Sequence, residues 1–152
     1  MSETAGAESV AGGAVPTIVG FHHFAPSVTD IEASVTWYER VFGMQRVPGV
    51  FRHYGSEEAG HGMLLREPRS GIAIGIHYHG ANKGERFDET RTGLDHMSFQ
   101  VASRSELEAW RSRLDALGVP HSPITDMEEP NVHTVLVFRD PDNIQLEFIV
   151  LP

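Results

Sequence analysis

Gly20-Phe-His-His-Phe-Ala-Pro-Ser-Val28 and Gly93-Leu-Asp-His-Met-Ser-Phe-Gln-Val101 are two segments of this chain that follow one plan. When they are aligned without a gap, each begins with glycine and ends with valine, and His23 meets His96. Similarity between distant segments of one chain is typical of a duplicated structural unit. The sequence therefore predicts two copies of one supersecondary unit.

An apolar-periodic run closed by a glycine follows each of these segments, at 31–43 and at 107–118. The apolar residues recur at helical spacing, and a glycine commonly ends a helix. The expected buried stripes are Ile31, Val35, Tyr38 and Phe42 in the first run and Leu107, Trp110, Leu114 and Leu117 in the second. The candidate N-cap residues are Thr29 or Asp30 and Ser103 or Ser105. We therefore expect two amphipathic helices.

The segments directly before and directly after each predicted helix look like strands. Two further strand candidates follow in each half: 62–66 and 72–78 in the first, and 134–139 and 144–150 in the second. The repeat continues here, because Leu65-Arg-Glu-Pro68 aligns with Phe138-Arg-Asp-Pro141. Arg139-Asp-Pro-Asp142 is expected to be an ordinary turn, in which proline fixes the backbone. Each half thus has the order βαβββ.

The predicted fold class is α+β, with two βαβββ modules that form a curved mixed sheet around a cleft. Each helix covers one face of its sheet and leaves the other face concave, so two such units side by side enclose a place for a small ligand. One compact domain is expected over 18–152. Within it we expect a first module (18–80), a linker (81–92) and a second module (93–152). Residues 1–17, poor in large apolar side chains, are expected to be a disordered tail.

Composition excludes several classes of function. The 152 residues carry a formal net charge of −9, which argues against nucleic acid or a membrane surface as a partner. The chain has no cysteine, so a disulfide framework, a thiolate zinc site and a cysteine nucleophile are excluded. The first stretch has no Lys, no Arg and no long apolar run, so neither a signal peptide nor a membrane span is expected. A cytoplasmic location is the resulting expectation.

His23 and His96 occupy equivalent repeat positions, and Glu147 interrupts the otherwise apolar last strand. Side chains alternate along a strand, so His22 and His23 are expected to point to opposite faces, as are Asp95 and His96. Taken singly, such residues are commonly hydrogen-bonded or exposed without a function. Taken together, two imidazoles and a carboxylate predict a divalent metal, because a buried carboxylate requires compensation that a cation supplies.

These motifs resemble the vicinal oxygen chelate superfamily, which includes glyoxalase I, bleomycin-resistance proteins, fosfomycin-resistance transferases and extradiol dioxygenases. The resemblance covers residues 18–152, and its carriers are His23, Val28-Thr-Asp-Ile31, Trp37-Tyr38, Phe42-Gly43-Met44, Gly93-Leu-Asp-His96-Met-Ser-Phe99, Phe138-Arg-Asp-Pro-Asp-Asn143 and Leu146-Glu147. It implies that His23, His96 and Glu147 hold one metal. It also implies a homodimer in which units pair between chains, although a site within one chain stays open.

The chain departs from glyoxalase I at Gly75, the repeat partner of Glu147, where such members place a fourth protein ligand. Three ligands with open positions are typical of a catalytic metal. His77 and His79 share a strand face with Gly75. His77 could bind the metal, act as a general base or line the pocket, and a wet histidine pair at a strand end is equally compatible. The other histidines are expected on the surface: His53, His61, His121 and His133.

The leading hypothesis is an enzyme that chelates adjacent oxygens of a small substrate on a divalent Fe, Mn, Ni or Zn ion, with Glu147 and His77 as candidate catalytic residues. Lyase, isomerase or dioxygenase chemistry and thiol transfer to an epoxide are all compatible with this ligand set. The alternative is a metal-free antibiotic-sequestering protein of the bleomycin-resistance type. The acidic charge suits a cationic drug, whereas such a protein has no need of a His-His-Glu set.

Overall fold

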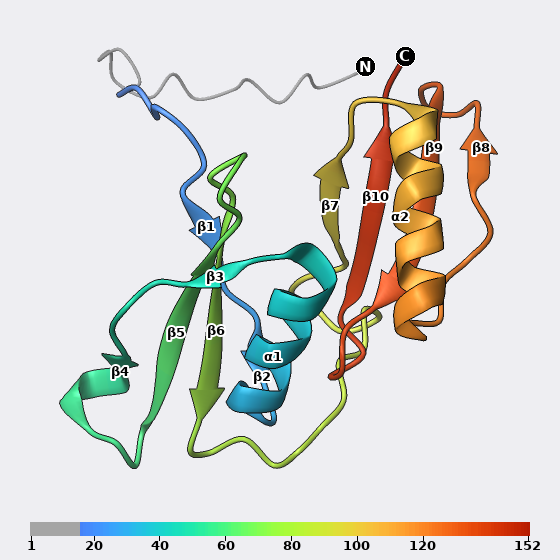
Figure 1. The fold of residues 1–152 in the computed structure, drawn as a ribbon. Coiled ribbons are helices and arrows are strands. Elements are labelled where there is room, and N and C mark those ends of the chain that lie inside the picture. Colours follow the sequence, from blue (N-terminus) through green and yellow to red (C-terminus); the bar gives the residue numbers. More distant parts are fainter. Residues whose placement is uncertain (1–15) are drawn as a thin grey trace, which may run out of the picture.

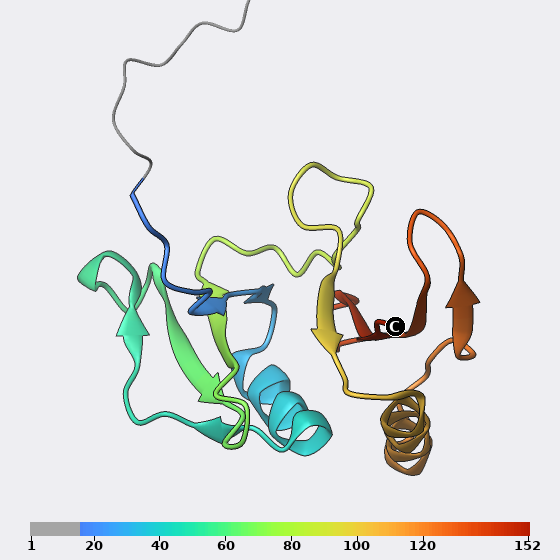
Figure 2. The ribbon, with the colours of Figure 1, turned by 90° about the horizontal axis from the view of Figure 1, so that it is seen from above.

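The computed structural model describes residues 16–152 and contains two units, each with a helix and a mixed sheet (Figure 1). Residues 1–15, most of the expected tail 1–17, lie outside the described residues. Both helices lie on one side of the molecule and the linker between the units lies on the other (Figure 2). The predicted α+β fold of two βαβββ modules is confirmed. No helix of the described part is long and apolar enough to cross a bilayer.

The first unit builds its sheet around two long antiparallel strands. Its elements are β1 (His23–Phe24), β2 (Ser27–Val28), α1 (Ile31–Phe42), β3 (Gln45–Arg46), β4 (Phe51–Arg52), the 3₁₀ turn η1 (His53–Gly55), β5 (Gly60–Arg66) and β6 (Ala73–His79). β1 and β2 are one interrupted strand, parallel to β6, and β6 pairs with β5. Pro26 lies in the interruption, and its carbonyl accepts the His77 N–H at 3.0 Å. β6 therefore stays bonded along the whole split strand.

The second unit repeats this arrangement with fewer interruptions. Its elements are β7 (Met97–Gln100), α2 (Arg104–Leu117), β8 (Thr125–Met127), β9 (His133–Arg139) and β10 (Gln145–Val150). β7 runs parallel to β10, and β9 pairs antiparallel with both β10 and β8. The strand order is β7-β10-β9-β8, against β1-β6-β5-β3 in the first unit. In both units the first strand therefore lies beside the last, as a duplicated βαβββ unit requires.

The helix boundaries follow from their capping residues. α1 begins after Asp30, whose carboxylate accepts an N–H of the first turn, and ends at Gly43, which has φ +69°. α2 begins after Ser103 and ends at Gly118, with φ +67°. Glycine suits this left-handed conformation because it has no Cβ. α2 begins three residues before the predicted run because Ser103, not Ser105, is the N-cap.

The core lies where the two helices pack against their sheets. The α1 stripe is buried as predicted, and in α2 Leu107 and Leu114 are buried while Trp110 and Leu117 are half-buried. Phe42, at the end of α1, joins the two halves: its ring centroid is 5.0 Å from that of Phe99 and 5.8 Å from that of Phe148. A shared aromatic contact of this kind makes one core from two units.

The turn between β9 and β10 links the two units through two buried carboxylates. Tyr38 of α1 donates its hydroxyl hydrogen to Asp140 at 3.1 Å, and both side chains are buried. Thr29, just before α1, donates both its backbone N–H (3.1 Å) and its hydroxyl (2.6 Å) to Asp142. The expectation of an ordinary turn at Arg139–Asp142 is therefore incomplete, because its acidic side chains reach into the other unit.

Candidate functional site

The open face of the first sheet carries His23, His77 and His79. The register of β1 with β6 and the two-residue period of a strand place these three side chains on the same face. The opposite face, toward α1, carries Ile74 and Ile76, which are fully buried. The prediction that His77 and His79 share a strand face is thus confirmed, and His23 lies on that face with them.

The open face of the second sheet carries Glu147, and His96 stands just before β7. His96 Nε2 lies 3.6 Å from Glu147 Oε1, and the Glu147 side chain is only 15% exposed. On the other side of the same ring, His96 Nδ1 lies 2.6 Å from Asp95 Oδ1. The imidazole is thereby fixed between two carboxylates, with Nε2 directed toward Glu147. This is the arrangement in which an outer carboxylate orients a metal-binding histidine.

The side chains before the two predicted histidine ligands do not alternate as expected. His22 Nδ1 lies 2.7 Å from His23 Nδ1, and Asp95 contacts His96 in the same way. Alternation fails because β1 begins only at His23 and β7 only at Met97, so the preceding residues lie outside the strands. In both repeats the preceding residue contacts Nδ1 of the histidine, which leaves Nε2 for a ligand.

The three predicted metal ligands do not form one cluster within a single chain. Within residues 16–152, no group of three or more His, Asp or Glu side chains is close enough to hold a metal ion. The structure brings His96 and Glu147 together on the second sheet and presents His23 on the open face of the first sheet. Within one chain, His23 therefore lies on a different sheet face from His96 and Glu147.

A second group of imidazoles, here named the histidine cluster, consists of His53, His77 and His79. His53 Nε2 lies 2.7 Å from His77 Nδ1, and the ring centroids of His53 and His79 are 4.4 Å apart. The expectation that His53 is a surface residue is wrong, because the residue is half-buried and its Nδ1 is fully buried. The turn η1 folds the His53 ring back over β6, and no local sequence pattern predicts this contact. The other expected surface histidines are also half-buried: His61, His121 and His133.

Two glycines make room for the His77 ring. A Cβ at Gly62, directly opposite on β5, would lie 2.5 Å from His77 Cε1, and a Cβ at Gly75 would lie 3.2 Å from His77 Nε2. The ring therefore lies over Gly62, and its Nε2 edge reaches toward Gly75, the position at which the family resemblance places a fourth ligand. Burial lowers the pKa of His77 below its ordinary value of 6.5, and neighbouring imidazoles, chiefly His53, add to the effect.

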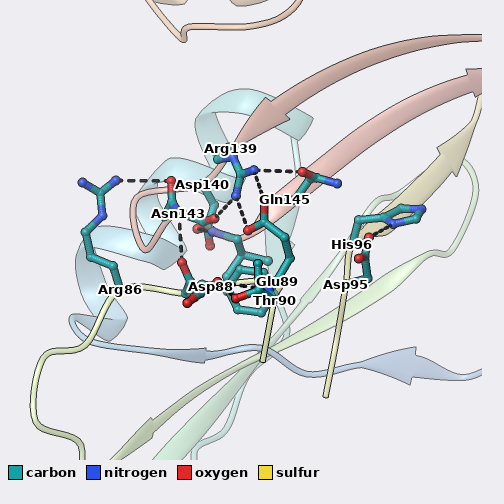
Figure 3. A network of polar contacts seen from close by, with 12 residues as sticks. Arg86, Asp88, Glu89, Thr90, Asp95, His96, Arg139, Asp140, Asn143 and Gln145 are labelled. Atoms are coloured by element: carbon teal, nitrogen blue, oxygen red, sulfur yellow. Dashed lines mark hydrogen bonds and ion pairs between the residues drawn. The ribbon is translucent and has the colours of Figure 1, made fainter. Parts of the chain in front are cut away.

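Arg139 ties the linker between the units to the second sheet. Its guanidinium donates to both carboxylate oxygens of Glu89, at 2.6 and 3.0 Å, and to Gln145 Oε1 at 2.9 Å. Figure 3 shows these contacts, with the separate pair of Asp95 and His96 beside them. The hydrogen bonds from Arg139 lower the pKa of Glu89 to about 2. Arg139 thus anchors the linker beside β10, the strand that carries Glu147.

A cavity of about 690 Å³ adjoins the open face of the first sheet at its linker end. Its lining includes Ser27 and His79 from the sheet and Lys83, Arg86 and Leu94 from the linker region. This volume lies in the range of small-molecule sites. Neither His23, His96 nor Glu147 lines it, so the cavity is a space next to the histidine cluster and not the candidate metal centre.

A sequence model of the Glyoxalase/Bleomycin resistance protein/Dioxygenase superfamily matches residues 20–148. The chain belongs to this superfamily. The match extends from the first strand of the first unit to the last strand of the second and includes His23, His96 and Glu147. No curated protein matches the chain significantly.

Solved structures of other superfamily members have the same fold. A glyoxylase/bleomycin resistance protein/dioxygenase domain from Frankia sp. EAN1pec is 29% identical, with a TM-score of 0.77 over 90% of this chain and 94% of that one. A glyoxalase family protein from Enterococcus faecalis is 20% identical (TM-score 0.68; 86% and 97% covered). The fosfomycin resistance protein FosX from Listeria monocytogenes, solved with Mn(II) and sulfate, is also 20% identical (TM-score 0.62; 90% and 95% covered). At such identities the last two establish the shared fold only.

Proposed function

We propose that this superfamily member is a metal-dependent enzyme that acts on a small oxygenated molecule. One divalent ion, Fe, Mn, Ni or Zn, is held by His96 and Glu147 together with His23. The observation that carries the proposal is the His96–Glu147 pair, in which an oriented Nε2 faces a largely buried carboxylate. When bound, the ion would supply Lewis acidity to two adjacent oxygens of the substrate.

The geometry of the pair fits a metal ion. Two ligand atoms at ~2.0–2.2 Å from one metal, at a near-tetrahedral angle, lie ~3.4 Å apart. His96 Nε2 and Glu147 Oε1 are 3.6 Å apart, which leaves room for an ion between them with little movement. Asp95 at Nδ1 favours the tautomer whose Nε2 lone pair is free to coordinate. Two histidines and one carboxylate leave coordination positions for substrate, which suits a catalytic site.

The third ligand comes from a second copy of the chain in this proposal. His23 lies on the open face of the first sheet, and His96 and Glu147 lie on that of the second. Within residues 16–152, each of these faces is the one turned away from the helix of its unit. If the first-unit face of one copy meets the second-unit face of the other in a homodimer, twofold symmetry makes the reciprocal contact as well, so that two equivalent sites form. Each metal then takes His96 and Glu147 from one chain and His23 of the partner subunit. FosX, with its Mn(II), shows that this fold accommodates a divalent ion in another member.

Complementation between two defective chains tests this arrangement. A mixture of His23→Ala and Glu147→Gln chains that exchange subunits contains heterodimers with one intact and one doubly damaged site. Random exchange predicts recovery of about a quarter of the wild-type metal content, measured by elemental analysis after gel filtration. If the site forms within one chain, the mixture will recover no metal.

The matched control mixes His96→Ala with Glu147→Gln. Both substitutions affect the ligand pair that one chain supplies, His96 and Glu147. No combination of these chains therefore yields an intact site, whether the site forms within one chain or between two. Metal recovery in this control would show that the two substitutions do not abolish binding. Dilution of the wild-type protein to monomer should also release the metal, because each chain alone offers only two ligands.

His77 and Glu147 are the proposed catalytic residues. Glu147 combines a ligand role with contact to the reacting oxygens, and His77 lies on the open face that carries His23. A metal-free sequestering protein is the competing function, and its support is the net charge of −9. Metal titration of the wild-type protein separates the two. Absence of stoichiometric uptake, with no thermal stabilisation by Mn, Fe, Ni or Zn, would leave sequestration as the function.

A further inference from the structure

The contact between His53 and His77 has the geometry of an in-plane hydrogen bond. The ring nitrogens are 2.7 Å apart while the ring centroids are 5.0 Å apart, and the ring planes differ by only 6°. Two rings with this separation and orientation lie edge to edge. The N–H of one ring then points at the in-plane lone pair of the other, so one proton is shared between His53 Nε2 and His77 Nδ1.

The opposite nitrogen of His53 decides which ring donates. His53 Nδ1 is buried and has no hydrogen-bond partner within residues 16–152. If His77 donated to His53 Nε2, neutral His53 would carry its own proton on this buried Nδ1, with no acceptor. If His53 donates from Nε2, its Nδ1 carries only a lone pair. A buried N–H without an acceptor is rarer in proteins than an under-used acceptor, so the second arrangement is favoured.

Donation by His53 fixes the state of His77. Neutral imidazole has one protonated nitrogen, so a His77 ring that accepts at Nδ1 carries its proton on Nε2. That nitrogen lies between Gly62 and Gly75, where a Cβ would be 2.8 Å and 3.2 Å away respectively, and on the sheet face that carries His23. A protonated Nε2 has no lone pair with which to bind a metal or remove a proton from substrate. It can donate a hydrogen bond to an oxygen.

We propose that His53 is a positioning residue that holds His77 with its proton on Nε2, so that His77 acts as a hydrogen-bond donor to a negatively charged oxygen of the substrate. With its proton on Nε2, His77 serves as a hydrogen-bond donor and not as a metal ligand or a general base. A donor already in place where oxygen charge develops stabilises that charge without reorganisation. The substrate role depends on the proposed function, whereas the proton position is a property of the unliganded chain.

Nuclear magnetic resonance of the ¹⁵N-labelled full-length protein, without added metal, tests the proton position. Long-range ¹H–¹⁵N correlations distinguish the protonated from the unprotonated nitrogen of each neutral histidine, and loss of one ring's signals in His77→Phe assigns them. We expect His77 to be protonated at Nε2 and unprotonated at Nδ1. The reverse assignment would overturn the proposal.

Substitution of His53 separates its positioning role from a packing role. In His53→Gln, the amide Nε2 can still donate to His77 Nδ1, so the Nε2-protonated form of His77 should persist. In His53→Leu, which packs but cannot donate, His77 should give a mixture of both neutral forms. Identical His77 spectra in His53→Leu and the wild type would contradict a role for His53. In Gly62→Ala, the added Cβ would lie 2.5 Å from His77 Cε1 and displace the ring, while the backbone at this position suits alanine because its φ is not positive. His77 should then also lose the Nε2-protonated form expected of the wild type.

Metal affinity separates this proposal from the proposed function. Because His77 is a donor and not a ligand, His77→Phe should bind Mn(II) or Zn(II) with less than a ~10-fold change from the wild type. A larger loss would make His77 a ligand and overturn this inference while the metal function stands. If the wild type itself takes up no metal, the proposed function fails, and the proton position is still decided by the spectra of the unliganded chain.

Discussion

Glu147→Gln will lower the affinity of the protein for divalent metal by more than ~100-fold, because removal of a direct ligand exceeds the 10–100-fold cost of losing an outer-shell partner. The amide keeps the shape of the side chain but loses the negative charge that a cation requires. The folded chain should tolerate the change, since the contact with His96 at 3.6 Å is the interaction of Glu147 that the structure shows. The melting temperature without metal should therefore stay close to that of the wild type.

Isothermal titration with Mn(II) and Zn(II), alongside thermal unfolding with and without metal, measures this effect. The matched control is Glu128→Gln, which removes the same charge at an exposed position of the same unit. Metal should raise the melting temperature of the wild type and of the control but not that of Glu147→Gln. Near-native affinity in Glu147→Gln would show that the carboxylate is not a ligand.

Local features of this fold could be predicted from the sequence because short-range interactions decide them. Asp30 and Gly43 delimit α1 by satisfying backbone groups within one turn, and Ser103 and Gly118 do the same for α2. The order βαβββ followed from the repeat, since equivalent apolar patterns in the two halves must bury equivalent faces. The superfamily was indicated by motifs in both halves, and membership is confirmed over residues 20–148.

The parts of the site that could not be predicted from the sequence depend on contacts between segments that are distant in the chain. His53 reaches His77 only because η1 turns the chain back over β6, and Tyr54 at the centre of that turn has φ +52°. The strand starts at His23 and Met97 decide where His22 and Asp95 point, and boundaries of strands are poorly marked in sequence. The family resemblance already placed His96 near Glu147. The separate position of His23 depends on the relative orientation of the two sheets, which no local sequence pattern specifies.

The burial of Asp140, in the turn between β9 and β10, was not predicted from the sequence, and it makes stability depend on pH. Asp140 accepts hydrogen bonds from Tyr38 Oη at 3.1 Å and from the backbone N–H of Ile144 at 2.8 Å. Desolvation of this carboxyl outweighs these bonds and raises its pKa from 3.8 to about 6. The carboxyl group joins α1 to the second unit, so its ionisation acts where the two units meet.

The sign of the effect follows from proton binding. Between the unfolded pKa of 3.8 and the folded pKa of about 6, the folded state holds a proton on Asp140 that the unfolded state has lost. The stabilising contribution of Asp140 to the unfolding free energy is therefore fully present below pH 3.8, and it is lost as the pH rises through about 6. The difference between the two pKa values corresponds to about 3 kcal/mol of unfolding free energy.

Asp140→Asn isolates this contribution, because asparagine keeps an acceptor for the backbone N–H groups and never ionises. We expect the unfolding free energy of the wild type, relative to Asp140→Asn, to fall by about 3 kcal/mol between about pH 4 and pH 7. Urea denaturation across this range measures the difference. Asp88→Asn is the control. Hydrogen bonds from Thr90 lower the pKa of Asp88, whose side chain is 44% exposed, below 3.8, so the effect of this substitution appears only under more acidic conditions. If the difference in unfolding free energy between the wild type and Asp140→Asn stays constant from pH 4 to 7, Asp140 is ionised in the folded protein throughout this range. The hydrogen bonds from Tyr38 and Ile144 would then outweigh the effect of burial on its pKa.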